Sequence, residues 1–481
     1  MATYYVKPTD GDDTKDGSSW ANAWKTINHS LSPGDVVLVE KSAETQLSGT
    51  LSVNNGSTTV STSQDLTGEL SQYDIIKIDT EQTYYMVKAV SANSITLYRP
   101  FRGPNKTNVN GYKLTKHSPG GDFVVQSDGQ AGNLITIKGG INTSNDSQDG
   151  LTVIDKGFDL NWKDFVRVER IGTYHDDYNW QRGDVGCEIY DCYAFRATTQ
   201  NFIDFRCCKI EKLVIEVGKG FSRSWQAELK DYEYFGGGGD QAIRGTQVGL
   251  VVEGLKAGDC SEFYYASGGT ACTQITVIDG HIGERSISDI IKLDDRTHLD
   301  IVFKHTKLEN YTDLFEGSYD YWSGRVGFEF LNREDKHEYY IFLGHSTSKP
   351  YYAAKVEKDT TVYKSAAPSA KITPREGKAY ACIAHLIPCE ANQQKTVSVW
   401  LRKNSSYGSS NRPKMVVGYW TGTLPNLTWN EEEAVMSDVN DTWEQVSKTV
   451  TPSVKGAIVV KICVCSANAG AAAWYDDLEV Q

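Results

Sequence analysis

Three features that would point to common functions are missing from this sequence. No apolar stretch is long enough to cross a membrane. The amino terminus runs from Met1 straight into Tyr4-Tyr5-Val6, without a basic stretch followed by an apolar run. Basic residues are also in the minority, since 49 Lys and Arg stand against 62 Asp and Glu. We therefore expect a soluble protein that is made in the cytoplasm, has no conventional secretion signal, does not insert into membranes and does not bind nucleic acid.

The ten cysteines lack the spacing of a metal site. Cys207-Cys208 and Cys463-x-Cys465 have no matching second pair and no histidine cluster at zinc spacing. The chain is also far larger than the small secreted scaffolds that depend on disulfides. Three cysteines fall at predicted inward positions, where a thiol behaves as a small hydrophobe: Cys187, Cys192 and Cys208. The sequence predicts no metal site and no cofactor.

What the sequence does contain is a repeated phrase in its middle third: apolar, any, apolar, two spacers, then a small or apolar residue. The copies read Val166-x-Val168-x-x-Ile171, Cys187-x-Ile189-x-x-Cys192, Ile203-x-Phe205-x-x-Cys208, Leu250-x-Val252-x-x-Leu255, Ile275-x-Val277-x-x-Gly280, Ile301-x-Phe303-x-x-Thr306 and the weaker Val326-x-Phe328-x-Phe330. Alternation with a period of two predicts a strand with one buried face. The extra spacer predicts a corner, after which a second short strand begins.

The spacing of the copies indicates how the strands stack. The later copies start at residues 250, 275, 301 and 326, a repeat of about 25 residues that is typical of stacked units. One coil of this length cannot bury its own inward face, so each coil must pack on the next. The pattern therefore predicts a parallel β-helix.

The first 40 residues predict a cap for this rod. Trp20, Trp24 and Ile27 lie at i, i+4 and i+7, which predicts one face of a short helix with Ser18 or Ser19 as its N-cap. A cap at this place would cover the exposed end of the solenoid, where an open edge invites pairing with other chains.

Several stretches resemble the right-handed parallel β-helix (pectate-lyase-like) superfamily. They are Tyr4 to Asp12, Asp16 to Ile27, Pro33 to Val39, Asp128 to Lys138 and Val153 to Asp155. The resemblance covers residues 1–40 and about 120–345. It implies the fold but not an activity, because the superfamily contains lyases, hydrolases, epimerases and inert structural rods.

Two further parts are expected outside the rod. Short alternating strands within residues 45–118, such as Asp74 to Ile78 and Tyr84 to Val90, predict a small β-barrel or sandwich. This pattern is similar to modules inserted in tailed-phage virion proteins. From about residue 346, evenly spaced strands that end in Trp474 to Val480 predict an antiparallel β-sandwich that resembles a carbohydrate-binding-module jelly roll.

We therefore predict an all-β chain in four parts. Residues 1–44 form the N-terminal cap and first strands of a right-handed parallel β-helix, and residues 45–118 form an inserted small β-barrel. Residues 119–345 form the rest of the β-helix, and residues 346–481 form a C-terminal antiparallel β-sandwich of the jelly-roll type.

Catalysis on such a rod would need two or three carboxylates, or a carboxylate with Arg or Lys, on one exposed face. The acidic candidates are His175-Asp176-Asp177 with Asp184, Glu228 with Asp231, Asp240, and Asp289 with Asp294-Asp295-Arg296. The catalytic set taken from them is Asp176, Asp177, Asp294, Asp295 and Arg296. Adjacent aspartates are also ordinary in solvated turns, and no spacing proves that any two converge.

Aromatic residues are candidates for sugar platforms, because flat apolar sugar faces stack on Trp and Tyr. The carbohydrate-binding candidates are Tyr178, Trp180 and Trp225 on the rod and Tyr419, Trp420 and Trp429 on the sandwich. Trp162 and Tyr232 on the rod belong to the same group. With 11 Trp and 27 Tyr in the chain, packing or a subunit contact is the alternative role for each.

Three functions fit these observations. The first is a virion structural protein of a tailed phage, such as a tail spike, fibre or surface decoration, which contacts other virion proteins and host-surface polysaccharide. The second is a phage depolymerase, a polysaccharide lyase or glycoside hydrolase that cleaves capsule or lipopolysaccharide on its rod. The third is a bacterial polysaccharide-degrading enzyme with its own binding module, which the missing secretion signal disfavours.

The absence of a coherent catalytic set favours the first function. Resemblance to β-helical spikes also implies a homo-oligomer, with a trimer among the options. Host, glycan, position on the particle and subunit number are not encoded in any pattern that we recognise.

Overall fold

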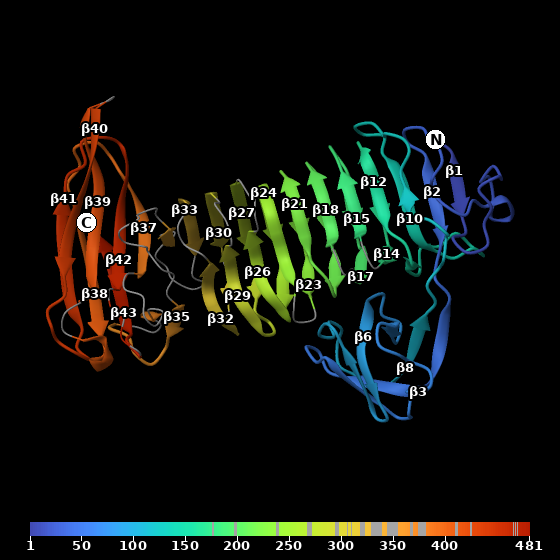
Figure 1. The fold of residues 1–481 in the computed structure, drawn as a ribbon, viewed down its shortest axis with the longest axis horizontal. Coiled ribbons are helices and arrows are strands. Elements are labelled where there is room, and N and C mark those ends of the chain that lie inside the picture. The colour runs from blue at the N-terminus through green and yellow to red at the C-terminus, as the bar shows by residue number, and fades with distance from the viewer. Residues whose placement is uncertain are drawn as a thin grey trace. The chain divides into compact units, whose positions relative to one another are not determined.

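The computed structural model describes residues 1–175, 178–196, 200–236, 240–266, 272–293, 298–304, 306–308, 310–317, 323–328, 339–343, 355–365, 369–373, 381–408, 412–423, 426–464, 466, 468 and 470–481. Within these residues the chain is all-β, with two one-turn 3-10 helices, so the predicted fold class is confirmed (Figure 1). The chain divides into two compact units, which are described separately. The first consists of Met1–Tyr265, Ile278–Ser288 and Leu308–Asn310, and the second of Ala266–Val277, Asp289–Lys307 and Tyr311–Gln481.

The first unit begins with the cap. Strands β1 (Thr3–Val6) and β2 (Val36–Glu40) pair in parallel, and β2 pairs with β10 (Ile135–Ile141). Helix η1 (Trp20–Asn22) is capped by the Ser19 hydroxyl, which accepts from the backbone N–H of Asn22. The predicted helix therefore ends before Trp24, which differs from our expectation.

The reason for this difference lies at the edge of β1. The backbone N–H of Trp24 donates to the Tyr5 carbonyl, and the Trp24 carbonyl accepts from Lys7, so this segment pairs with the edge strand. The Trp24 ring is buried and stacks on Tyr4 with centroids 4.6 Å apart. Covering the open edge satisfies backbone groups that a helix would leave exposed.

The solenoid strands of the first unit form three parallel stacks. One stack contains β9 (Phe123–Val124), β12 (Phe158–Lys163), β15 (Tyr178–Gly183), β18 (Gln200–Arg206), β21 (Phe221–Trp225) and β24 (Gln241–Glu253). The next contains β13 (Val166–Glu169), β16 (Glu188–Tyr190), β19 (Lys209–Glu211), β22 (Glu228–Lys230) and the end of β24. The third contains β11 (Thr152–Ile154), β14 (Ile171–Tyr174), β17 (Tyr193–Arg196), β20 (Val214–Glu216), β23 (Glu233–Phe235), β25 (Lys256–Gly258) and β28 (His281–Ile282).

The inward positions of the second stack form one continuous apolar column. Val168 pairs with Ile189, Ile189 with Ile210, Ile210 with Leu229 and Leu229 with Val252, and all five are buried. Paired residues in these coils are separated by 21, 19 or 23 positions. The coils here are therefore shorter than the predicted 25 residues.

One copy of the phrase also divides differently from our prediction. Ile203-x-Phe205 belongs to β18, and Cys208 precedes β19 across a corner, so the two halves lie in different stacks. The prediction of buried thiols is confirmed, because Cys187, Cys192 and Cys208 are free and buried. Cys463 is disulfide-bonded, which the sequence did not predict.

Corner residues explain why the phrase needs its spacer. Arg170, Asp191, Lys212 and Asp231 occupy corresponding corners with φ of 53°, 51°, 55° and 52°. Each donates its backbone N–H to a carbonyl of the following coil. This left-handed conformation costs about 1–2 kcal/mol for a residue with a side chain. The ladder of hydrogen bonds offsets that cost, so the corners do not need glycine.

Residues between β2 and β9 form the predicted barrel. Its strands are β3 (Glu44–Val53), β4 (Thr59–Thr62), β5 (Ile75–Ile78), β6 (Tyr84–Ser91), β7 (Ser94–Leu97) and β8 (Lys106–Leu114), closed in the order β3-β4-β7-β6-β5-β8. All neighbours with a recorded register are antiparallel. The barrel has its own core, which includes Leu51, Val60, Ile76, Val87 and Ile95.

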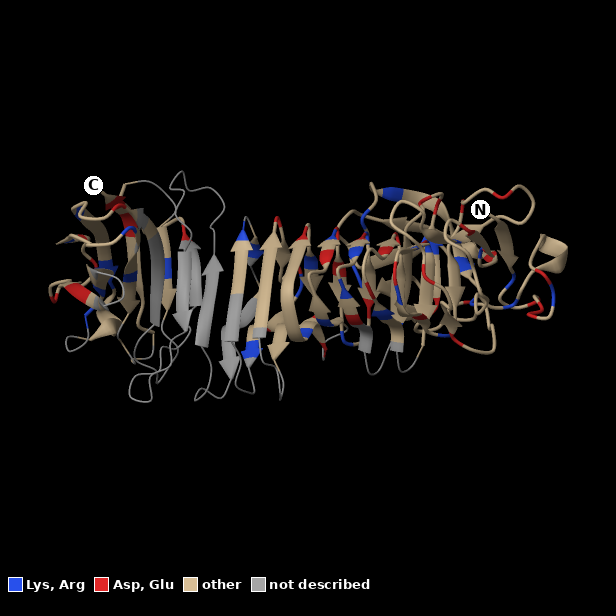
Figure 2. Cartoon of the chain, turned by 90° about the horizontal axis from the view of Figure 1, so that it is seen from above, with Lys and Arg blue, Asp and Glu red and all other residues tan. Residues whose placement is uncertain are grey.

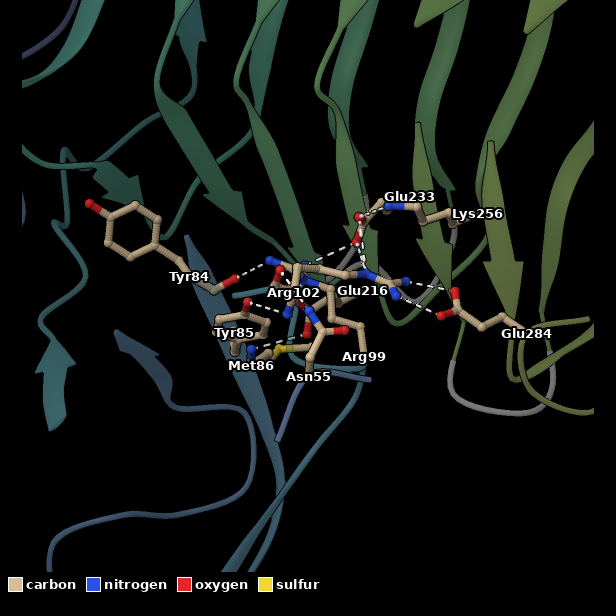
Figure 3. A network of polar contacts seen from close by, with 10 residues as sticks. All are labelled: Asn55, Tyr84, Tyr85, Met86, Arg99, Arg102, Glu216, Glu233, Lys256 and Glu284. Carbon is tan, nitrogen blue, oxygen red and sulfur yellow. Dashed lines mark hydrogen bonds and ion pairs between the residues drawn. The ribbon is translucent and has the colours of Figure 1, made fainter. Parts of the chain in front are cut away.

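A network of charged groups attaches the barrel to the solenoid (Figure 3). The Arg99 guanidinium donates from Nε to Glu216 at 2.8 Å and from Nη1 to Glu233 at 3.0 Å. Arg102 donates to Glu233 and, through both Nη atoms, to Glu284 at 2.6 and 2.7 Å. These carboxylates come from three coils of the solenoid, since Glu216 lies in β20, Glu233 in β23 and Glu284 just after β28. The barrel is therefore held against several coils at once.

Buried charges make this junction specific. The Arg99 and Glu216 side chains are 1% and 0% exposed. The Arg99 guanidinium also lies 4.2 Å from the Tyr85 ring centroid and donates to the Tyr84 carbonyl. Burial raises the pKa of Glu216 to about 7, whereas the neighbouring cations Arg99, Arg102 and Lys256 hold the pKa of Glu233 below its ordinary value despite burial.

The second unit contains the end of the solenoid and the sandwich. Apart from its last residue, β26 (Cys260–Ala266) still belongs to the first unit. The solenoid strands that lie wholly or mostly in the second unit are β27 (Cys272–Ile278), β29 (Ile287–Leu293), β30 (His298–Lys304), β32 (Tyr311–Gly317) and β33 (Ser323–Phe328), and β31 (Lys307–Leu308) straddles the two units. Strands β30 and β33 pair in parallel, with Ile301 opposite Val326, so the predicted 25-residue step is confirmed here. The next pair, β33 with β34 (Tyr339–Leu343), is antiparallel.

Two antiparallel sheets follow, as predicted. One contains β37 (Ala381–Cys389), β42 (Gly456–Val464), β39 (Lys414–Thr423) and β40 (Asn426–Val435). The other contains β35 (Lys355–Asp359), β36 (Ser369–Thr373), β43 (Ala473–Val480), β38 (Lys395–Lys403) and β41 (Glu444–Val450), and η2 (Ser405–Tyr407) follows β38. Their shared core includes Val397, Leu401, Val417 and Val460. The predicted boundary at residues 345 and 346 lies outside the described residues.

The described surface carries both signs of charge. Figure 2 shows acidic and basic residues interspersed over the strands and loops of the described part. No helix within that part is both long enough and apolar enough to span a membrane.

Candidate functional site

One outward column of side chains crosses four coils of the first stack. The register pairs Lys163 with Gly183, Gly183 with Phe205 and Phe205 with Ser224. The residues that follow these positions are Asp164, Asp184, Arg206 and Trp225, which we name the corner column. Gly183, Phe205 and Ser224 are buried, so alternation turns the corner column toward solvent.

A backbone bulge just before the column adds a second row of outward side chains. Trp162, Arg182, Asp204 and Arg223 all have positive φ, between 54° and 57°. The register shifts at this place in β12 and between β21 and β24. Such bulges re-aim side chains and increase the local twist. Here they bring charged and aromatic groups beside the corner column.

Two arginines of the second row are paired with carboxylates. Arg182 donates to both oxygens of Asp159, with Nε 3.0 Å from Oδ1. Arg223 Nη2 lies 2.9 Å from Asp204 Oδ2. Burial raises the pKa of Asp204, and the positive charges of Arg223, Arg206 and Arg182 oppose this shift.

Arg206 has aromatic neighbours instead. Its guanidinium carbon lies 4.4 Å from the ring centroid of Trp162 and 5.1 Å from that of Trp225, and we name this trio the Trp–Arg stack. The Arg206 side chain is exposed, and both tryptophans are half-buried. Among the described residues, no ion pair or side-chain hydrogen bond of the Arg206 guanidinium is found.

The other end of the corner column is acidic. Burial, together with the negative charges of Asp184 and Asp128, raises the pKa of Asp164. The backbone N–H of Asp164 donates to Asp128 at 3.1 Å, and Lys163 Nζ lies 3.7 Å from the same carboxylate. A raised pKa favours the protonated form of a carboxyl group, which is the form that a general acid needs.

A groove of about 420 Å³ lies next to the column. Its lining includes Leu134, Phe165, Gly186, Glu188 and Lys209, which come from successive coils. Gly186 has φ of 71°, and a Cβ atom there would come within 2.4 Å of the Phe165 ring. Glycine therefore allows the aromatic floor of the groove to lie where it does.

The structure places the predicted aromatic platforms in different environments. Trp225 is half-buried and lies in the Trp–Arg stack, and its role as a sugar platform stays a prediction. Trp180 is 0% exposed, stacks on Phe158 at 4.8 Å and donates from Nε1 to the Tyr193 carbonyl. It therefore packs inside the solenoid, so its prediction as a sugar platform is corrected. Tyr232 is buried as well.

On the sandwich, only one predicted platform is clearly exposed. Tyr419 packs against the core, and Trp420 is 42% exposed. Trp420 pairs in register with Trp429, but the side chain of Trp429 lies outside what the structure describes, as does that of Tyr178.

None of the five predicted catalytic residues can be placed. Asp176, Asp177, Asp294, Asp295 and Arg296 lie outside the described residues. The other acidic candidates are found in several places. Asp184 lies in the corner column, Glu228 in β22 and Asp231 at the next corner, Asp240 has its pKa raised by burial, and Asp289 is buried in β29.

Sequence reasoning missed Asp164 and Arg206, although a signal was present. Asp164 lies two residues before Val166 and Arg206 two before Cys208, the inward positions that open the second-stack strands. Aligning the coils on those positions would have placed Asp164 and Arg206 in one column, with Asp184 one residue out of step. In the described part of the chain, no group of three or more His, Cys, Asp or Glu residues is placed to hold a metal ion.

Comparisons with known proteins give only distant similarities. No family model and no curated protein matches the chain. Among solved structures, a family 16 carbohydrate-binding module is 17% identical with a TM-score of 0.22, over 27% of this chain and 86% of that one. The CBM22-1 xylan-binding domain of Paenibacillus barcinonensis Xyn10C is 14% identical with a TM-score of 0.21, over 27% and 81%.

A third similarity extends over more of the chain. The enzymatically active domain of tailspike protein 4 from bacteriophage CBA120 is 10% identical with a TM-score of 0.22, over 79% of this chain and 70% of that one. Identities and TM-scores this low do not bear on function. The assignment to the pectate-lyase-like superfamily stays a prediction.

Proposed function

We propose that this chain is a glycan-binding structural protein that holds a polysaccharide against the solenoid face at the corner column. The Trp–Arg stack beside the 420 Å³ groove is the observation that carries this proposal. Sugar rings have flat apolar faces that pack on aromatic rings, while their hydroxyls bond to charged groups nearby. The Trp–Arg stack, Glu188 and Lys209 offer both kinds of contact.

The stacked coils suit a polymer better than a small molecule. Adjacent strands in a sheet are about 4.8 Å apart, so the corner column repeats outward side chains at that spacing over four coils. A polysaccharide lying along the column would meet successive side chains with successive sugar units. The groove adds a hollow in which one unit can be buried.

We also propose that the chain works as a homo-oligomer on a tailed-phage particle, where it contacts other virion proteins. Support for this part comes from the resemblance of the inserted barrel to phage virion modules and of the rod to β-helical spikes. Imaging of the native particle would test the location and the subunit number, with a trimer as the first state to look for.

Glycan binding can be tested with the full chain on an array of bacterial capsular and lipopolysaccharide preparations. We expect binding to a subset of them, and Trp225→Ala should weaken it at least tenfold. Trp420→Ala is the matched control, because it removes an exposed tryptophan from the sandwich instead. Absence of binding to every preparation, or equal binding by wild type and Trp225→Ala, would contradict the proposal.

A depolymerase is the second candidate function, and one observation favours it. Asp164 has a raised pKa and occupies the place that Asp184 takes in the next coil. Strands one coil apart are about 4.8 Å apart, close to the separation of about 5–5.5 Å between the carboxyl groups of retaining glycosidases. Release of oligosaccharide by the wild type, abolished in Asp184→Asn, would favour this function over binding alone.

A further inference from the structure

The arginines around Asp204 differ in how their charges are neutralised. Arg182 is bonded to Asp159, and Arg223 is bonded to Asp204. Arg206 contributes to the field at Asp204 but is held by the two tryptophan rings. Three arginines (Arg182, Arg206 and Arg223) therefore share this region with two carboxylates (Asp159 and Asp204). A chain with a net charge of −13 thus keeps a surplus cation beside two tryptophan rings at its surface.

The stack also determines what Arg206 can bind. The two tryptophan ring centroids lie 4.4 and 5.1 Å from the guanidinium carbon, so the rings cover part of the group, and its N–H donors stay available on the exposed side. An arginine edge presents parallel N–H groups that match the two oxygens of a carboxylate. Because the rings hold the side chain in place, less conformational entropy is lost when a ligand binds.

The acidic end of the column gives the site a direction. Asp164, Asp184 and Asp128 would repel a negative group, and Arg206 would attract it. An anionic sugar unit would therefore lie with its charged group at Arg206 and its neutral neighbours along the column or in the groove.

We propose that Arg206 binds the carboxylate of an acidic sugar, such as a uronic acid, in the polysaccharide bound at the corner column. This inference rests on the proposed function and deepens it by naming the class of glycan. Trp162 and Trp225 act as positioning residues that hold the guanidinium edge toward the ligand. Sulfate and phosphate esters share the anionic chemistry, so the experiment must separate them from carboxylates.

The test uses the full chain and an array of bacterial polysaccharides of known repeat unit. The array includes neutral, carboxylated, sulfated and phosphorylated members. For the carboxylated member that binds most tightly, the carboxyl groups are also reduced to alcohols. We expect carboxylated members to dominate the bound set and carboxyl reduction to weaken binding at least tenfold. The affinity of Arg206→Gln for the native polymer should fall by a similar factor relative to the wild type. For the reduced polymer, its affinity should be almost the same as that of the wild type.

Two variants keep the result specific. Arg206→Lys retains the charge but loses the planar edge, so its affinity should lie between those of the wild type and Arg206→Gln. Lys230→Gln removes a cation from an exposed position in β22 and should bind like the wild type. If Arg206→Gln unfolds the solenoid, its amide exchange in β18 and β21 will reveal this, and the comparison of native with reduced polymer on the wild type still decides the question.

The possible outcomes separate the two proposals. If no polysaccharide binds, the proposed function fails and this inference fails with it. If neutral polymers bind as tightly as carboxylated ones, or if reduction has no effect, the proposed function stands and the carboxylate site is wrong. A bound set dominated by sulfated or phosphorylated members would likewise overturn the choice of carboxylate.

Discussion

Removing Arg99 tests whether the charged network holds the barrel to the solenoid. Arg99→Met preserves much of the side-chain volume but removes the donors to Glu216, Glu233 and the Tyr84 carbonyl. Glu233 keeps Arg102 and Lys256, whereas Glu216 keeps only the backbone N–H of Met86 among the residues that the structure describes. The variant therefore leaves a fully buried carboxylate without its cation.

The expected magnitude follows from this burial. Breaking a buried ion pair by removing one partner costs about 3–5 kcal/mol. Each factor of ten in an equilibrium corresponds to about 1.4 kcal/mol. At pH 8, where Glu216 is mostly ionised, amide exchange in β6 and β7 should therefore accelerate by about two to four orders of magnitude. Exchange in β38 and β41 of the sandwich should not change.

Two further variants make the reasoning refutable. Arg99→Met combined with Glu216→Gln removes the orphaned charge, so exchange should slow at least tenfold relative to Arg99→Met alone. Lys256→Met is the control, because Lys256 is half-exposed and 3.6 Å from Glu233, and exposed pairs contribute about 0–1 kcal/mol. Equal exchange in Arg99→Met and wild type, or no rescue in the double variant, would refute the account of the junction.

Further predictions concern pH, packing and reactivity. The raised pKa of Glu216, about 7, means that its protonated form favours the docked barrel, so this stabilisation is present below pH 4.5 and lost as pH rises through 7. The depressed pKa of Glu233 gives a stabilisation of opposite sign, which is present above pH 4.5 and lost in more acidic solution. Barrel protection measured by hydrogen exchange should therefore be greatest near pH 4.5, and a flat profile would contradict it. Trp180→Ala should destabilise the solenoid by about 3–5 kcal/mol in thermal or urea unfolding, and a change below about 1 kcal/mol would show that it is not core. Of the six free cysteines that the structure describes, Cys207 should react first with a thiol reagent, because the others are buried, and mapping of the labelled peptide checks this. Gly186→Ala should weaken glycan binding by displacing the aromatic floor of the groove, and unchanged affinity would argue against use of the groove.

The fold could be predicted from the sequence because its signals are local and periodic. Inward residues such as Val168 and Ile189 alternate with polar ones, and the spacer marks the corner. The 25-residue step came from the copies that start at 250, 275, 301 and 326, so it did not describe the shorter coils of the first unit. The copy at Ile203 and Phe205 was grouped with strands of the second stack, although it belongs to β18 in the first stack. Alternation identifies a strand but not the stack to which it belongs.

The junction could not be predicted, because its partners are far apart in the chain. Arg99 and Glu216 are 117 positions apart, and Arg102 and Glu284 are 182 apart. Nothing near Arg99 in the sequence distinguishes it from a solvated arginine. Its burial follows only from where the barrel packs.

The candidate site was partly accessible from sequence. Trp225 and Trp180 were both predicted to be aromatic platforms, although Trp180 is buried. The sequence alone does not show whether a tryptophan in a strand lies on the inner or the outer face. Arg206 was missed because its place in the column shows only after the coils are aligned on their inward positions. It gains its role only when the stacking of the coils brings Trp162 and Trp225 close to its guanidinium group.

The central claim is that glycan is held at the corner column, and a paired affinity measurement tests it most directly. The polysaccharide that binds most tightly on the array would be titrated against the wild type, the double variant Trp162→Ala with Trp225→Ala, and Trp420→Ala. The account predicts that the double variant binds at least tenfold more weakly while Trp420→Ala matches the wild type. Full affinity in the double variant, with the loss appearing in Trp420→Ala instead, would contradict it.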